Sequence, residues 1–128
     1  MVIDDSPDDS RMTNMAIARI TPTVVVQNIF DGAAAIDLLT SDNALRPGLI
    51  FLDLKLPKVS GLNVLKALRT DVKTSTVPVV IFSSSDLESD VSQASELGAN
   101  AYLVKPMDWS EYARIVTETI SKYMLSNR

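Results

Sequence analysis

The chain has 128 residues, of which 46% are hydrophobic and 22% charged, a balance typical of one compact domain over residues 1–128. It contains no cysteine and no histidine, which excludes disulfides, thiolate or histidine metal sites, a Ser-His-Asp triad and a phosphohistidine on this molecule. Sixteen acidic residues oppose twelve basic ones, and the resulting charge of −4 disfavours direct binding to nucleic acid. Twelve of the acids are aspartates, and four lie within the first nine residues.

Short apolar runs rich in β-branched residues recur along the chain and predict five strands. They lie at 1–3, 23–27, 49–52, 77–82 and 101–104. None approaches the roughly 20 residues that a membrane-spanning helix needs, so we expect no contact with a membrane.

Helical patterns separate these runs. Ser6 and Pro7 are typical of a helix start, and Asp8 and Asp9 suit its positive end as ordinary helix-start acids. A short helix is predicted at 33–39, and leucines at helical spacing predict the next one. These leucines are Leu62, Leu65 and Leu68.

The fourth and fifth helices have clearer faces. The fourth is predicted from an apolar face, with Ser85 and Glu88 at its start and Gly98 at its end. That face consists of Leu87, Val91, Ala94 and Leu97. Asp108 and Glu111 form a capping box for the last helix, whose residues at helical spacing are interpreted as core. They are Trp109, Tyr112, Val116, Ile120 and Tyr123.

Alternating strands and helices predict an α/β fold with a doubly wound parallel sheet covered on both faces. Ligands bind such sheets beyond the carboxyl ends of the strands. The residues that follow these ends carry distinct chemistry: Asp4, Asp5, Asp53, Ser83 and Lys105. Three carboxylates at one edge repel one another, and oxygen ligands of this kind suit Mg²⁺.

A carboxylate, a bound Mg²⁺, a hydroxyl and a lysine together predict a phosphoryl-transfer site. The metal ion and Lys105 would neutralise the charge of the transferring group, while the Ser83 hydroxyl and backbone amides bind its oxygens. A carboxylate of this edge would be the nucleophile and form an acyl phosphate.

Four motifs in this order resemble the receiver domain of two-component response regulators over essentially the whole chain. They are Val-Ile-Asp4-Asp5, Leu-Ile-Phe-Leu-Asp53-Leu-Lys-Leu-Pro57-Lys-Val-Ser-Gly61, Pro78-Val-Val-Ile-Phe-Ser83-Ser-Ser, and Gly98-Ala-Asn-Ala-Tyr102-Leu-Val-Lys105-Pro106. Lys105-Pro-Met-Asp108-Trp109 and the segment 40–47 are similar to single-domain regulators paired with bacterial phytochromes. The resemblance implies a flavodoxin-like three-layer (βα)5 sandwich with strand order 2-1-3-4-5.

The resemblance also implies the role of each residue in the metal site. Asp53 matches the phosphoacceptor and a metal ligand, and Asp5 matches a direct ligand of Mg²⁺. Asp4 matches a ligand that acts through water, and the backbone carbonyl of Lys55 a further ligand.

The switch residues follow from the same resemblance. Ser83, Ser84 and Lys105 match the residues that bind the phosphoryl group, and Ser83 and Tyr102 match the pair that moves on activation. The peptide bond before Pro106 is usually cis in this family. The surface of the fourth helix, fifth strand and fifth helix would change, and the resemblance also allows a homodimer through it.

The resemblance implies a cytoplasmic signalling protein and not a turnover enzyme. A sensor histidine kinase or a histidine phosphotransfer protein would donate the phosphoryl group, and a downstream protein would receive the signal. One alternative is a receiver fragment of a larger hybrid kinase or regulator. Another is a haloacid-dehalogenase-like phosphatase, although that chemistry requires an acid where this chain has Lys55.

Overall fold

A computed structural model of the chain describes residues 1–41 and 46–125. The strands are β1 (Val2–Ile3), β2 (Asn28–Ile29), β3 (Ile50–Leu52), β4 (Val79–Ser83) and β5 (Ala101–Val104). The helices are α1 (Pro7–Ile20), α2 (Gly32–Thr40), α3 (Gly61–Thr70), α4 (Glu88–Glu96) and α5 (Trp109–Ile120), and a π-helical turn, η1 (Ser121–Leu125), follows.

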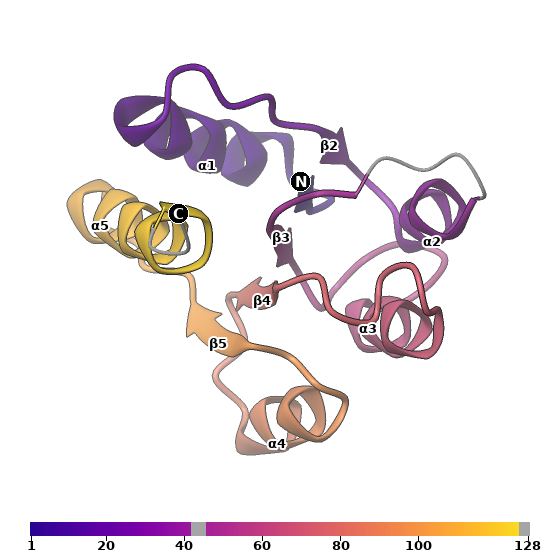
Figure 1. Cartoon of the computed structure of the whole chain (residues 1–128). Coiled ribbons are helices and arrows are strands. Elements are labelled where there is room, and N and C mark those ends of the chain that lie inside the picture. The colour runs from indigo at the N-terminus through magenta and orange to yellow at the C-terminus, as the bar shows by residue number, and fades with distance from the viewer. Residues whose placement is uncertain (42–45, 126–128) are drawn as a thin grey trace.

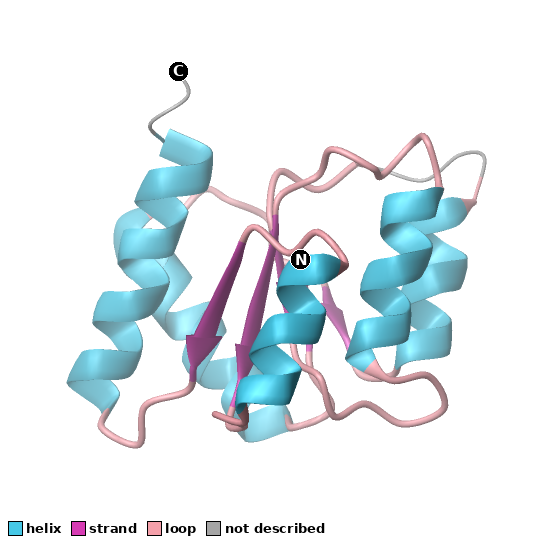
Figure 2. Cartoon of the chain, turned by 90° about the horizontal axis from the view of Figure 1, so that it is seen from below, coloured by secondary structure: helices cyan, strands magenta, loops and turns pink. Residues whose placement is uncertain are grey.

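The five strands form one parallel sheet in the order β2-β1-β3-β4-β5. The strand arrows visible in Figure 2 point in one direction, and Figure 1 shows α1 and α5 on one face of the sheet and α2, α3 and α4 on the other. This arrangement confirms the predicted doubly wound, three-layer sandwich. It also brings every carboxyl end of a strand to the same edge.

Alternation along the strands produces two apolar cores, one on each face of the sheet. Val79 and Ile81 of β4 are buried in the core beneath α2, α3 and α4. Val80 and Phe82 point the other way, into the core beneath α1 and α5. Burial on both faces explains why the central strands appear in the sequence as continuous apolar runs.

Side-chain caps occur at the starts of α1 and α5, as predicted, and also at the start of α2. Ser6 Oγ accepts a hydrogen bond from the Asp9 amide, and Asp31 Oδ1 accepts one from Ala34. Asp108 Oδ2 likewise accepts the Glu111 amide. These bonds satisfy amides that a helix start otherwise leaves unpaired, so α1, α2 and α5 begin where the sequence predicts.

The prediction of a strand at 23–27 is wrong, because β2 consists of Asn28 and Ile29. The earlier residues alternate as a strand would: Val24 and Val26 pack on the core, and the exposed fraction of Val25 is 87%. They have no strand to pair with, because β1 contributes only two residues to the ladder. Alternating burial therefore occurs in a segment outside the strand ladder, which meets β1 through the Gln27 carbonyl, the acceptor of the Val2 amide at 2.8 Å.

The predicted apolar face of α4 is covered only in part: Ala94 and Leu97 pack on the core, and Leu87 and Val91 do not. Leu87 is 62% exposed and Val91 37% exposed, whereas Ala94 is fully buried. The helix starts at Glu88 without a side-chain cap, and Ser85 Oγ instead donates to Asp90 Oδ2 at 2.6 Å. Because α4 lies over the edge of the sheet next to β5, the sheet covers only part of its apolar side.

Two other expectations concern the peptide bond before Pro106 and the segment 40–47. The described peptide bonds are all trans, including the bond before Pro106, so the cis form implied by the resemblance is absent. Within the segment 40–47, residues 42–45 lie outside the described residues.

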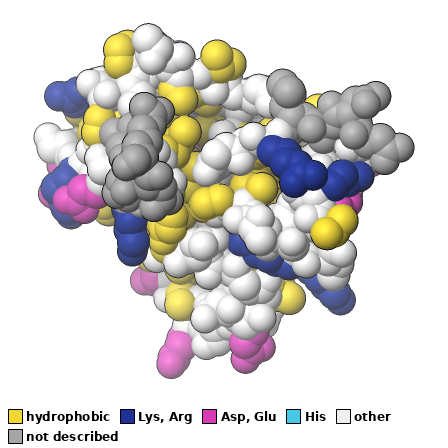
Figure 3. Space-filling view, viewed as in Figure 1, with side chains coloured by type: hydrophobic (Ala, Val, Ile, Leu, Met, Phe, Trp, Pro, Cys, Tyr) yellow, Lys and Arg dark blue, Asp and Glu magenta, His cyan; other side chains and the backbone are white. Residues whose placement is uncertain are grey.

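The opposite edge of the sheet, at the amino ends of the strands, is apolar. A cavity of about 300 Å³ opens there, and Leu49, Phe51, Ile17 and Ile120 are among its walls. Figure 3 shows this side of the molecule, with hydrophobic side chains visible between the elements. In the part of the chain that the structure describes, no helix combines the length and apolar character required to cross a membrane.

Gly61 at the start of α3 allows the loop after Asp53 to fold closely onto the helix. A Cβ atom at this position would lie 2.1 Å from the Asp53 carbonyl oxygen and 2.6 Å from Leu54 Cα. We expect Gly61→Ala to lower the free energy of unfolding by roughly 3 kcal/mol, because backbone atoms must move. Urea unfolding measures the difference.

Gly48→Ala is the matched control for this prediction. Its Cβ would meet only the flexible end of Met124, at 3.3 Å, and we expect a change below about 1 kcal/mol. Equal losses in the free energy of unfolding for the two variants would show that stability does not depend on the close approach of Gly61 to the loop.

Candidate functional site

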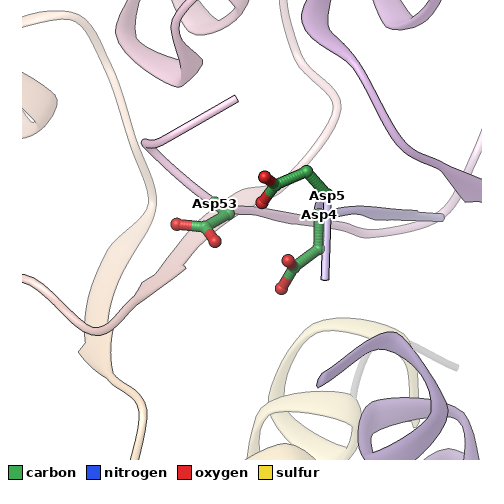
Figure 4. Close-up of side chains that lie close together, drawn as sticks. All are labelled: Asp4, Asp5 and Asp53. Carbon is green, nitrogen blue, oxygen red and sulfur yellow. The ribbon is translucent and has the colours of Figure 1, made fainter. Parts of the chain in front are cut away.

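Three aspartates meet at the carboxyl edge of the sheet. Each of Asp4, Asp5 and Asp53 offers a carboxylate oxygen, and these oxygens lie within 4.8 Å of one another. Figure 4 shows the three side chains close together at the ends of β1 and β3. Asp4 and Asp53 are buried and Asp5 is exposed, so the group is open to solvent on one side.

The strand register explains this meeting. Ile3 of β1 pairs with Leu52 of β3, so the next residues, Asp4 and Asp53, leave the sheet side by side. The Asp53 amide donates to the Ile3 carbonyl at 2.9 Å and the Asp4 amide to Ile29 at 3.0 Å. Backbone hydrogen bonds therefore fix both carboxylates before any ligand binds.

Lys105, directly after β5, supplies the cation of the site. Its Nζ lies 2.7 Å from Asp4 Oδ2, 2.9 Å from Asp9 Oδ2 and 3.0 Å from Asp53 Oδ2. Its side chain is only 7% exposed, so these ion pairs are poorly screened by water. The Lys105 amide donates to the Ser83 carbonyl at 2.8 Å, which anchors the lysine beside β4.

Burial and charge act in opposite directions on the ionisable groups. Burial raises the pKa of the Asp4 carboxyl, and the hydrogen bond from Lys105 offsets only part of this effect. Burial alone would lower the pKa of the Lys105 ammonium, but hydrogen bonds to Asp4 and Asp9 and the charge of Asp53 outweigh it and raise the pKa. The lysine therefore stays charged because the carboxylates surround it.

Asp9 is the site residue that sequence reasoning missed. It was interpreted as an ordinary helix-start acid, and its amide is indeed capped by Ser6. Its carboxylate, however, reaches across to Lys105. No local signal in the sequence could have found this contact, because Asp9 and Lys105 are 96 positions apart along the chain.

Besides Lys105, the residues predicted to bind a phosphoryl group are Ser83, at the end of β4, and Ser84, in the loop that follows. Ser83 is fully buried, and its Oγ accepts the Ser85 amide at 3.2 Å. Ser84 is exposed. The Lys55 amide donates to Asp53 Oδ1 at 3.4 Å, which places Lys55 at the start of the loop beyond the acceptor.

Tyr102 of β5 is half-buried and contacts the same loop as Ser83. Its hydroxyl donates to the Ser85 carbonyl at 2.8 Å. Burial raises the pKa of this phenol. The contact joins β5 to the residues that follow β4.

The donor set fits a hard divalent cation. Carboxylate oxygens are the ligands that Mg²⁺ and Mn²⁺ prefer, and the chain has neither cysteine nor histidine to offer a softer ligand. Among the described residues, Asp5 makes no ion pair, so its charge is left for another cation to balance.

Comparison with known proteins agrees with this geometry. The family model of the response regulator receiver domain matches residues 1–117. The chain is similar to response regulator Rcp1 of Synechocystis sp., with 32% identity over 120 residues that cover 91% of this chain and 82% of Rcp1.

Solved structures give the same result. The phosphorylated cyanobacterial phytochrome response regulator RcpA superposes with a TM-score of 0.91 at 33% identity, covering 99% of this chain and 93% of that one. The Mn²⁺-bound form of Rcp1 has a TM-score of 0.79 at 31% identity, covering 94% of this chain and 89% of that one. With its strand order and its cluster of carboxylates, the chain belongs to the family of response regulator receiver domains.

Proposed function

We propose that the chain accepts a phosphoryl group on Asp53 in a Mg²⁺-dependent reaction and that the modified state signals through protein contacts. The observation that carries the proposal is the meeting of Asp4, Asp5, Asp53 and Lys105 at one edge of the sheet in a receiver domain. Because these 128 residues contain no histidine, the phosphohistidine donor lies outside them, on a sensor histidine kinase or a histidine phosphotransfer protein.

In the transfer, a carboxylate oxygen of Asp53 forms a bond to phosphorus as the bond from phosphorus to the histidine nitrogen breaks. The electron pair of the broken bond remains on the imidazole nitrogen, and the product is an acyl phosphate. Bound Mg²⁺, held by Asp5, Asp53, the Lys55 carbonyl and, through water, Asp4, would neutralise charge on the phosphoryl oxygens.

The chain's own residues then hold the phosphoryl group. The Ser83 hydroxyl is buried at the end of β4, where it accepts the Ser85 amide, and in the modified state it would turn toward a phosphoryl oxygen. The Lys105 ammonium already lies 3.0 Å from Asp53 Oδ2 and can pair with a second oxygen, and the exposed Ser84 can bind a third. These contacts neutralise the charge that the transfer brings into the site.

The output surface lies on α4, β5 and α5. Large apolar side chains are exposed on α4 and around the end of β5: Leu87, Val91, Val104 and Met107. Tyr102 connects this surface to the loop after Ser83 through its bond to Ser85. A shift of Ser83 would move that loop and change the surface offered to a downstream protein or to a second copy of the chain.

This proposal makes the chain a cytoplasmic signalling protein that takes up one phosphoryl group and does not turn over a substrate. Acetyl phosphate with Mg²⁺ tests it directly. We expect one phosphoryl group per chain that withstands acid, is lost in hydroxylamine, and maps to Asp53 after borohydride reduction. An unlabelled chain, or a label elsewhere, would contradict the proposal. Steady hydrolysis of p-nitrophenyl phosphate would favour a phosphatase instead.

A further inference from the structure

Ser85, in the loop between β4 and α4, has a hydrogen bond at each of its polar groups. Its amide donates to Ser83 Oγ at 3.2 Å, and its carbonyl accepts from the Tyr102 hydroxyl at 2.8 Å. Its own hydroxyl donates to Asp90 Oδ2 at 2.6 Å and accepts the Leu87 amide at 3.3 Å. Ser85 is only 9% exposed, so a broken bond would leave a polar group buried without a partner. A displacement of Ser85 therefore acts on β4, β5 and α4 at once.

The bond between Ser85 and Asp90 ties this loop to the first turn of α4. At 2.6 Å it has the length of a charge-assisted O–H···O⁻ bond, which is roughly twice as strong as a bond between neutral groups. The amides of Asp90 and Val91 donate to the Leu87 carbonyl at 3.0 and 3.1 Å. The Asp90 carboxylate that Ser85 holds therefore belongs to the turn that these amide bonds close.

The two ends of α4 are held in different ways. Of its nine residues, all of which the structure describes, Ala94 alone is buried. Just beyond its last residue, Leu97 packs on the core and the Gly98 carbonyl accepts a hydrogen bond from Arg69 Nε at 3.0 Å. At its start, the described side chains of the first turn make one hydrogen bond, that of Asp90 with the loop. The start of α4 therefore depends on this bond, whereas its end is anchored by packing.

We infer that Ser85 is a branch point of the switch, and that Asp90 is the positioning residue of the branch that carries the state of Asp53 to α4. The inference rests on the proposed function. When Ser83 turns toward the phosphoryl group, the Ser85 amide loses its acceptor, and pairing this buried amide again favours a shift of the serine. The Ser85 carbonyl passes the shift to Tyr102 of β5, and the Ser85 hydroxyl passes it through Asp90 to the first turn of α4.

The test follows both branches by NMR while the chain is saturated with Mg²⁺ and beryllofluoride, a mimic of the bound phosphoryl group. In wild type we expect the amide signals of residues 88–91 and the ring signals of Tyr102 to shift. In Asp90→Ala the shifts of the amide signals should fall by roughly threefold or more, because a coupling between two sites needs a contact that differs between the states. The Tyr102 signals should still shift as in wild type.

Three further variants separate loss of this bond from general weakening of the helix. Asp90→Asn keeps an oxygen that accepts the same bond and should respond as wild type does. Glu88→Ala is the matched control, because it removes an exposed acid from the same turn that has no bonding partner among the described residues. It too should respond as wild type. Ser85→Ala should reduce the α4 response as Asp90→Ala does, and combining the two should reduce it no further.

Equal α4 shifts in Asp90→Ala and Glu88→Ala would overturn the inference. So would a loss of the Tyr102 response together with that of α4, since the two branches would then not be separate. A wild-type chain that bound beryllofluoride without a shift at residues 88–91 would also overturn it, while the proposed phosphorylation would stand. If wild type bound no beryllofluoride, the proposed function would fail and the inference with it.

Discussion

An Asp53→Asn chain is expected to take up no phosphoryl group from acetyl phosphate while remaining at least as stable as wild type. The amide is not a nucleophile, so labelling should fall by more than ~100-fold. Stability should hold because one of three crowded carboxylates loses its charge, and Lys105 keeps its ion pairs with Asp4 and Asp9. Mass spectrometry and urea unfolding measure the two effects on the same sample.

The control is Asp8→Asn, which removes the same charge from an exposed position on α1. It should label and unfold as wild type does. Labelling of the Asp53→Asn chain would show that another residue accepts the phosphoryl group. An Asp53→Asn chain whose free energy of unfolding fell by several kcal/mol would instead show that the Asp53 carboxylate stabilises the fold and is not destabilised by the neighbouring carboxylates.

Lys105→Met is expected to lose both function and stability. Labelling should drop by more than ~100-fold, because no cation remains to balance the phosphoryl charge. The free energy of unfolding at pH 7 should fall by about 3 kcal/mol, since Asp4 and Asp53 are left buried without a counter-ion. Lys66→Met, at an exposed position on α3, is the control and should change neither property by much.

The pH dependence of this loss has a definite sign. The folded structure raises the pKa of the Lys105 ammonium, so the stability that its ion pairs contribute is fully present below the ordinary pKa of a lysine. This contribution is lost only in strong alkali and is therefore constant between pH 5 and 7. Burial raises the pKa of Asp4, and removing Lys105 takes away the hydrogen bond and charge that lower it. The folded variant therefore binds a proton more readily than the unfolded chain, and its stability rises as the pH falls.

The difference in the free energy of unfolding between wild type and Lys105→Met should consequently be smaller at pH 5 than at pH 7. Saturating Mg²⁺ should narrow the gap in the same way, since it replaces the missing positive charge among the carboxylates. A gap unchanged by both pH and Mg²⁺ would mean that the loss comes from packing of the lysine stem rather than from unpaired charge.

Much of the fold could be predicted because its determinants are local in the sequence. Continuous apolar runs such as that of β4 indicated strands buried on both faces. Ser6, Asp31 and Asp108 lie where helix starts need a side-chain acceptor, and each makes the expected bond. The order of strands and helices then left few topologies, and the strand ends pointed to the residues of the site.

The remaining features depend on what lies opposite each residue in space. The segment at 23–27 alternates like a strand, but β1 is too short to pair with it. The apolar residues of α4 have helical spacing, yet Leu87 stays exposed because the helix lies over the edge of the sheet next to β5. Spacing gives the face of an element, and only the neighbouring elements decide whether that face is covered.

The sequence by itself determined the layered fold, the edge of the sheet that carries the site, and most of the charged residues of the site. These features depend on strand ends and helix caps, which short stretches of the sequence specify. Only the tertiary structure decided that Asp9 belongs to the site, because its contact with Lys105 joins residues 96 positions apart. It also decided that Lys105 has no donor left unbound, since that count requires the distances to three carboxylates at once. Contacts of this kind arise from the packing of α1 against α5, which no local pattern encodes.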